Sequence, residues 1–393
     1  MLRKRIDSDA AYLAALRHDF HRCPELMYEE VQTSGRVQTE LTKAGVAFKN
    51  GLAKGTGVLG FIPATRPGGK CVALRADMDA LPILEETGLP YASETPGKMH
   101  ACGHDGHTTI LVGVARALSQ EENRPNDVLL LFQPAEEGGA GGRAMCEDGA
   151  LDGRVLGKPA DIIYGLHGWP DEAAGQIRWK VGPMMAATNS WTITVRGQGG
   201  HAAAPHTTAD PVIAAAHIVT ALQSIASRNV DPLDSVVVST TKLDGGSAHN
   251  VIPESVEIWG TLRTLKEETR HMASQRILEI AQGVAAAMGC SAQVDIPEGY
   301  PVTVNDASAT ANVRRVAEQV LGEGRVAELA NPVMGGEDFS YYGAHVPASF
   351  FFVGLNASSG KMASVHTPRF DFNDAVIPDC VELMCRLALD TEK

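Results

Sequence analysis

The architecture of this 393-residue chain is indicated most clearly by Val128-Leu129-Leu130-Leu131-Phe132-Gln133-Pro134-Ala135-Glu136-Glu137, five apolar residues that lead into a turn and two carboxylates. A short run without polar alternation is typical of a strand buried on both faces of a parallel sheet. Three other runs have this form, at 72–75, 162–166 and 349–353. Helical patterns lie between several of them. We therefore expect an α/β catalytic domain with a mixed, mostly parallel sheet flanked by helices.

Side chains that can bind a metal ion follow or lie near these apolar runs: Cys102, His104, Glu136, Glu137, His167 and His366. In open α/β sheets, ligand sites form outside the carboxyl ends of the strands, where these side chains would gather. Thiolate, imidazole and carboxylate groups together are what a catalytic zinc- or manganese-type site needs. The pattern therefore predicts a metal-dependent hydrolase.

Two pairs of neighbours carry most of this prediction. Cys102 and His104 flank a glycine, and in an extended segment both side chains would project the same way and hold one metal or bridge two. Glu136 and Glu137 cannot both face one way in extended backbone, which favours one metal ligand and one general base. The alternatives are a buried cysteine beside a turn histidine, and a solvated acidic loop. Acids directly after a buried strand fit a solvated loop poorly.

The middle of the chain has a different pattern, with strands that alternate between apolar and polar residues. The expected elements follow the order β-α-β-β-α-β, at 191–195, 211–228, 235–241, 256–262, 266–288 and 291–296. This order is the ferredoxin-like unit. We therefore expect a catalytic domain made of 1–183 and 299–393, interrupted by an inserted α+β lid and dimerisation domain at 184–298.

Composition limits the partners and the compartment. The net charge of −13 argues against nucleic acid or an anionic membrane surface as a partner. Residues 1–7 are basic without an apolar segment after them, and no stretch is apolar for long enough to span a bilayer. The seven cysteines are scattered, so free thiols in a reducing cytoplasm are expected.

An acidic protein needs a local cation to bind an anionic substrate. In the inserted domain, a glycine-rich turn carries His201, while Asn250 and Arg263 supply an amide and a guanidinium. Together these groups could bind a substrate carboxylate and polarise its carbonyl. The alternative is that His201 is structural, as a lone histidine usually is.

Six motifs resemble one family throughout: 75–82, 99–107, 133–138, 199–201, 250–253 and 336–339. The chain is similar, from residue 17 to 389, to the N-acyl-amino-acid amidohydrolase branch of the aminoacylase and carboxypeptidase metallopeptidases, which includes hippurate hydrolases. The resemblance departs from the wider clan at Arg75, where other branches carry a metal-binding histidine. This departure leaves the role of Asp77 open.

The resemblance implies a site with two divalent metal ions and five ligands, namely Cys102, His104, Glu137, His167 and His366. It also implies that Glu136 is the general base and that His201 stabilises the oxyanion in the active site of a partner subunit, in a homodimer formed through the inserted domain. A thiolate ligand favours zinc, cobalt or nickel, while the resemblance admits manganese. The expected reaction is hydrolysis of a hippurate-like or N-acetyl amino acid to a carboxylic acid and a free amino acid.

Three rival functions remain open from the sequence. A dipeptidase on the same scaffold would require a free amine on its substrate. An amidase with Cys102 as the nucleophile would withstand chelators. A non-catalytic protein with a structural metal would normally supply four ligands at short spacings, which ligands spread from residue 102 to 366 fit poorly.

Overall fold

The computed structural model describes residues 1–66, 68–357 and 360–391. The chain divides into two compact units, which are described separately. Unit 1 comprises Met1–Met184, Val304–Asn331 and Asp338–Lys393, and unit 2 comprises Met185–Thr303 and Pro332–Glu337. Residues 299–303 and 332–337, expected in the catalytic domain, therefore group with the inserted one, while Met184 groups with unit 1. In the part of the chain that is described, no helix combines the length and apolar character needed to cross a bilayer.

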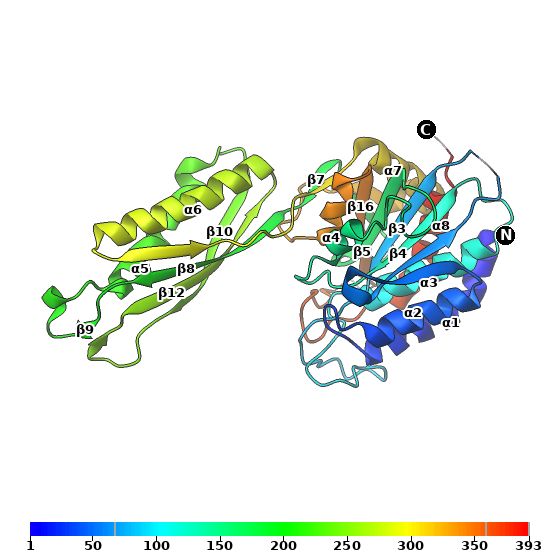
Figure 1. The fold of residues 1–393 in the computed structure, drawn as a ribbon. Coiled ribbons are helices and arrows are strands. Elements are labelled where there is room, and N and C mark those ends of the chain that lie inside the picture. The colour runs from blue at the N-terminus through cyan, green and yellow to red at the C-terminus, as the bar shows by residue number, and fades with distance from the viewer. Residues whose placement is uncertain (67, 358–359, 392–393) are drawn as a thin grey trace. The chain divides into compact units, whose positions relative to one another are not determined.

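Unit 1 is built on an eight-stranded sheet in the order β1-β2-β4-β3-β5-β16-β6-β15 (Figure 1). The strands are β1 (Ala47–Leu52), β2 (Gly57–Ile62), β3 (Cys71–Asp77), β4 (Asp127–Gln133), β5 (Ile162–Ala173), β6 (Ile177–Trp179), β15 (Val326–Glu328) and β16 (Ala348–Asn356). The central strands β4, β3, β5 and β16 are mutually parallel. Strand β2 pairs antiparallel with β4, and β1 pairs antiparallel with β2. The expected mixed, mostly parallel sheet is confirmed.

The helices of unit 1 bury the sheet. They are α1 (Leu2–Arg22), α2 (Val31–Lys43), α3 (His104–Ser119), α4 (Gly141–Glu147), α7 (Ala307–Leu321) and α8 (Ile377–Leu389). All seven residues of β3 and of β4 are buried, which explains why these strands show no polar alternation. Helix α3 packs against α1, α8 and β3, and its first residue is His104.

Strand β5 is longer than the apolar run predicts. Its pairing with β3 ends at Gly165, whereas its pairing with β16 continues to Ala173. His167 was expected just after a strand, but it lies inside β5, opposite Phe352 of β16. Because His167 lies beyond Gly165, where the pairing of β5 with β3 ends, it still stands at the carboxyl edge of β3 and β4.

Unit 2 contains an antiparallel four-stranded sheet in the order β10-β12-β8-β13 (Figure 1). Its elements are β8 (Ala187–Arg196), α5 (Pro211–Leu222), β10 (Val236–Asp244), β12 (Ser255–Thr264), α6 (Glu267–Ala287) and β13 (Ser291–Asp295). Alternate residues of β8, namely Trp191, Ile193 and Val195, pack into a core shared with both helices. The helix expected at 211–228 ends at Leu222 and is followed by a separate π-helical turn, Ile225–Asn229. The order and pairing are those of a ferredoxin-like unit.

Two further strand pairs complete the secondary structure. In unit 2, the short strands β9 (Gly200–His201) and β11 (Val251–Ile252) pair with each other. Strands β7 (Gly182–Met185) and β14 (Thr303–Asn305) form the other two-stranded sheet.

Candidate metal site

The structure brings all five predicted ligands together within unit 1. Cys102 Sγ lies 3.2 Å from His167 Nε2 and 3.3 Å from His366 Nε2. His366 Nε2 in turn lies 3.0 Å from Glu137 Oε1. Two groups of potential ligand atoms, each within 4.8 Å of one another, contain Cys102: one with His104 and His167, the other with Glu137 and His366. Cys102 therefore stands where it could contribute to two neighbouring metal positions.

The turn at Gly103 delivers Cys102 and His104 to the same place. The sequence pattern favoured an extended segment here, and that expectation is wrong, because Gly103 has φ 91° and precedes the first residue of α3. A Cβ on Gly103 would lie 3.0 Å from the Phe372 ring, so both the backbone angle and the space require glycine. The two side chains converge through a left-handed turn rather than through strand alternation.

The two carboxylates follow a turn as well. Ala135 has φ 56°, so Glu136 and Glu137 do not continue β4 in extended backbone as expected. The carboxylate of Asp79 accepts the N–H of Glu136 on Oδ1 and the N–H of Glu137 on Oδ2, both at 3.0 Å. His104, Glu136 and Glu137 place ligand atoms within 4.8 Å of one another. Asp79 therefore holds the turn that presents both carboxylates.

Backbone carbonyl groups set the orientation of two histidine rings. His104 Nδ1 donates to the carbonyl of Asp79 at 2.8 Å, and His167 Nδ1 donates to the carbonyl of Gly168 at 2.8 Å. In the neutral ring with Nδ1 protonated, which is the form that binds a metal ion, each histidine presents the lone pair of Nε2 to the cluster. This arrangement is typical of metal-binding histidines.

The buried Nε2 atom of His104 has no hydrogen-bond partner among the residues that the structure describes. Burial lowers the pKa of His104, but the charges of Asp77 and Asp79 outweigh it and raise the pKa to about 10. The surroundings of this nitrogen therefore attract a cation. A divalent metal ion would satisfy the unpartnered atom, so the donor set fits a metal site.

The pKa shifts of Cys102, His167 and Glu137 also fit metal ligands better than a site in which Cys102 is a free nucleophile. Burial and the charges of Glu137 and Glu136 raise the pKa of the Cys102 thiol well above its ordinary value. Burial holds the pKa of His167 well below its usual range, so this ring stays neutral. Burial opposes ionisation of Glu137, yet the hydrogen bond from His366 and the charge of His104 keep its pKa below the ordinary value. Without a cation, a Cys102 thiolate is disfavoured.

A buried salt-bridge network underlies the cluster and was not found from the sequence. Arg75 donates from Nε to Gln133 at 2.8 Å, from Nη1 to Asp77 at 2.6 Å and from Nη2 to Asp338 at 2.9 Å. These charged groups are fully buried. One sequence signal pointed to this network: Arg75 and Asp77 lie at the carboxyl end of a buried strand, the edge of the sheet where the predicted ligands also gather.

The other two histidines of the 99–107 segment differ in their surroundings. A ring nitrogen of His107 lies within 4.8 Å of potential ligand atoms of Asp77 and His104, but hydrogen bonds to Asp77 and to a backbone N–H occupy both of its nitrogens. His100 is buried, and within the described residues neither of its ring nitrogens has a hydrogen-bond partner. Burial lowers the pKa of His100 to about 4, so the ring is neutral.

His201, Asn250 and Arg263 all belong to unit 2. His201 lies exposed in β9, and its Nδ1 accepts the N–H of Ala203 at 3.0 Å. The carbonyl of Asn250 accepts the N–H of Ala202, so Asn250 and His201 are neighbours where β9 pairs with β11. Arg263 is half-buried on β12, and across 1–66, 68–357 and 360–391 its guanidinium has no hydrogen bond or ion pair. Burial alone lowers the pKa of Arg263, as expected for a guanidinium without an acidic neighbour.

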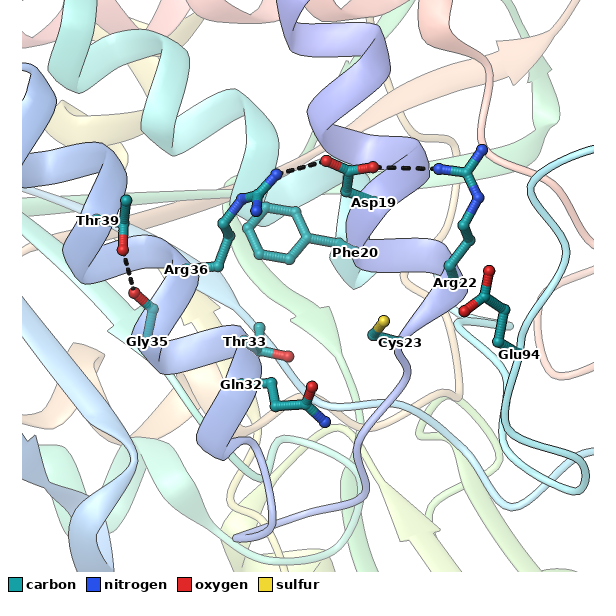
Figure 2. A pocket seen from close by; sticks show the side chains of 10 residues that line it. All are labelled: Asp19, Phe20, Arg22, Cys23, Gln32, Thr33, Gly35, Arg36, Thr39 and Glu94. Carbon is teal, nitrogen blue, oxygen red and sulfur yellow. Dashed lines mark hydrogen bonds and ion pairs between the residues drawn. The ribbon is translucent and has the colours of Figure 1, made fainter.

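A cavity of about 460 Å³ lies elsewhere in unit 1, between the end of α1 and the start of α2. Figure 2 shows the side chains that line it. Its lining contains none of the predicted site residues. Arg22 and Arg36, which reach it from either side, both pair with Asp19 between them. The charges of this cavity therefore partly neutralise one another, and we assign it no role.

Comparison with known proteins agrees with the geometry. The family description Peptidase family M20/M25/M40 matches residues 73–390. The chain is 41% identical over 383 residues to the IAA-amino acid hydrolase ILR1-like 4 of Arabidopsis thaliana, covering 96% of this chain and 85% of that protein. It is 42% identical over 366 residues to the N-acetyl-L-cysteine deacetylase of Bacillus subtilis, covering 93% and 84%.

A solved structure extends this agreement to three dimensions. The Bacillus subtilis YXEP protein, described as a dinuclear metal binding peptidase from the M20 family, superposes with a TM-score of 0.82 at 32% identity. The alignment covers 98% of both chains. The likeness therefore includes both units.

Proposed function

Because the chain belongs to peptidase family M20/M25/M40, we propose that it hydrolyses hippurate-like or N-acetyl amino acids to a carboxylic acid and a free amino acid. Membership confirms the resemblance drawn from the sequence motifs and makes the protein an enzyme that hydrolyses amide bonds. The substrate is inferred from relatives whose names specify an amino acid conjugated to an acyl group.

The observation that carries this proposal is the convergence of one thiol, three imidazoles and two carboxylates at the edge of β3 and β4. Cys102, His104, Glu137, His167 and His366 would hold two divalent ions, with Cys102 close to both positions. When bound, such ions polarise an acyl carbonyl and lower the pKa of a water molecule. Thiolate and imidazole donors favour zinc, cobalt or nickel, and manganese remains a candidate.

Glu136 is placed to serve as the general base. It is 6% exposed, its N–H is held by Asp79, and its carboxylate lies in one group with His104 and Glu137. It would accept a proton from the attacking water and later deliver a proton to the leaving amine. Glu137, whose pKa is held below its ordinary value, stays ionised as a ligand.

Unit 2 would supply the groups that recognise the rest of the substrate. Arg263 is a half-buried guanidinium without a described acidic partner, which suits a substrate carboxylate. Asn250 would assist this binding, and His201 would stabilise the oxyanion in the partner subunit of a homodimer. Strands β10 and β13 are the edges of the unit 2 sheet within the described chain, so they are the places where a second copy could extend it. The lid role of unit 2 and a cytoplasmic location stay predictions.

The test is hydrolysis of hippurate, N-acetylmethionine and a dipeptide by the purified protein as isolated, after chelation, and after return of zinc, manganese, cobalt or nickel. We expect acylated amino acids to outcompete the dipeptide, and activity to vanish on chelation and return with about two ions per chain. Preference for the dipeptide would favour a dipeptidase. Activity indifferent to chelation would favour Cys102 as a nucleophile.

A further inference from the structure

His107 is a buried histidine whose two ring nitrogens both bind neighbours. It lies one turn after His104 on α3 and is 1% exposed. Its Nδ1 lies 2.7 Å from Asp77 Oδ1, and the backbone N–H of Gly168 donates to its Nε2 at 2.8 Å. Because a backbone N–H can only donate, Nε2 carries the lone pair and Nδ1 carries the proton, which it donates to Asp77.

This hydrogen-bond chain continues on both sides of His107. On one side, Arg75 Nη1 donates to Asp77 Oδ2 at 2.6 Å, which fixes the carboxylate that receives the His107 proton. On the other side, the carbonyl of Gly168 accepts the Nδ1 proton of His167 at 2.8 Å. The Gly168 backbone is thus held by one histidine through its N–H and orients another through its carbonyl.

Close packing leaves the Gly168 backbone little freedom. A Cβ at this position would lie 2.8 Å from both Leu355 and Phe372, so only glycine fits without displacement. The His167 ring that depends on this backbone presents Nε2 at 3.2 Å from Cys102 Sγ. A shift of the Gly168 peptide would therefore change the angle at which His167 faces the other ligands.

We propose that His107 is a positioning residue that holds the Gly168 backbone and, through it, orients His167, so that it sets the affinity of the metal position that His167 binds. It does so without contacting the ion, because neither ring nitrogen is free. This inference rests on the proposed function, since it requires a metal ion at His167. Outer hydrogen bonds of this kind commonly change metal affinity about 10- to 100-fold.

The experiment compares cobalt binding by the metal-free full-length protein and its variants. His107→Phe keeps a ring of similar shape and removes both hydrogen bonds, whereas His107→Gln loses the ring and keeps an amide oxygen that can accept the Gly168 N–H. His100→Phe is the matched control, because it replaces a buried histidine of the same segment whose nitrogens have no described partner. The measurements are cobalt affinity by chelator competition, the thiolate-to-cobalt charge-transfer and d–d absorption bands, and urea unfolding of the metal-free protein.

We expect His107→Phe to lower cobalt affinity about 10- to 100-fold and to alter the d–d bands, His107→Gln to recover part of the affinity, and His100→Phe to match the unchanged protein. The reverse order, with His107→Phe binding normally and His107→Gln poorly, would show that the ring serves packing alone and would overturn the proposal. If His107→Gln recovered nothing and one ion per chain were lost, His107 would be a ligand, which overturns it too.

Should His107→Phe fail to fold, Gly168→Ala displaces the same backbone with His107 intact, and the same loss of affinity is expected. Normal cobalt affinity in a folded Gly168→Ala protein would contradict the proposal. If the unchanged protein showed no thiolate-to-cobalt band, the proposed function would be contradicted as well. This failure can be told apart from a failure of the His107 proposal alone, because it is seen in the unchanged protein and not only in the variants.

Discussion

Replacing Asp79 with asparagine should damage both the stability and the catalysis of this protein. Asp79 is 1% exposed, and its two carboxylate oxygens each accept one backbone N–H, from Glu136 and from Glu137, at 3.0 Å. Asparagine has the same shape but one oxygen only, so its NH₂ group would face one of these N–H groups. Asp79→Asn therefore exchanges a charge-assisted hydrogen bond for two opposed donors in a buried place.

The cost follows from these contacts. A hydrogen bond to a charged group contributes about 1.5–3 kcal/mol, and a buried donor left without a partner costs about 1–3 kcal/mol. The two contributions overlap, so we expect the free energy of unfolding to fall by about 2–4 kcal/mol. The turn that carries Glu136 and Glu137 would shift, and a displacement of about 1 Å at a reacting group can cost about 100-fold in rate.

Urea unfolding of the metal-free protein and kcat/KM for hippurate measure the two effects. Asp161→Asn is the matched control, because Asp161 accepts a single backbone N–H, from Cys71 at 2.7 Å, at the other end of β3 and is exposed. We expect this control to lose little stability and no activity. An Asp79→Asn protein with unchanged unfolding free energy and unchanged kcat/KM would refute the assignment of Asp79 as the group that holds the carboxylate turn.

Three further outcomes are expected. Glu136→Ala should fold, retain its metal and lose about 100-fold or more in kcat, as measured by steady-state kinetics and elemental analysis, and normal turnover would remove Glu136 as the base. Arg263→Ala should raise KM for an acyl amino acid more than for its carboxamide, and equal effects on both substrates would exclude Arg263 from carboxylate binding. Burial opposes protonation of His21, but its hydrogen bonds to Asp105 and Glu85 raise its pKa to about 9. Because the folded-state pKa lies above the unfolded value of about 6.5, this stabilisation is complete below pH 6.5 and is lost as the pH rises through 9. The difference in unfolding free energy between the unchanged protein and His21→Gln should therefore shrink by about 3 kcal/mol from pH 6 to pH 10. A difference that stays constant over this range would contradict the raised pKa of His21.

The strands and the identity of the candidate ligands could be predicted because they depend on local properties of the chain. The run at 128–132 has no polar residue, and such a run is stable only where both faces are covered. Histidine and glutamate beside such runs are costly to bury unless something binds them. For the same reason, the alternation along β8 predicted a strand with one buried face, and Pro211 marked the first turn of α5.

The turns could not be predicted in the same way. Gly103 and Ala135 both adopt positive φ, so the backbone turns at each and the alternation of an extended strand does not continue through it. An extended backbone was the simplest assumption for Cys102–His104 and for Glu136–Glu137, and it was wrong at both. The length of β5 was missed too, because its continuation past Gly165 is stabilised by β16, which lies far away in the sequence.

Local chemistry thus indicated which residues were candidate metal ligands and which segments had to be buried, because the cost of exposing an apolar strand or burying a bare charge belongs to the residue itself. Tertiary structure alone decided how those residues are held. Asp79 reaches the Glu136 turn 57 positions away, Arg75 reaches Asp338 across 263 positions, and His107 reaches Gly168 across 61. Hydrogen bonds require partners within about 3 Å, and only the packed sheet and helices bring such distant segments that close.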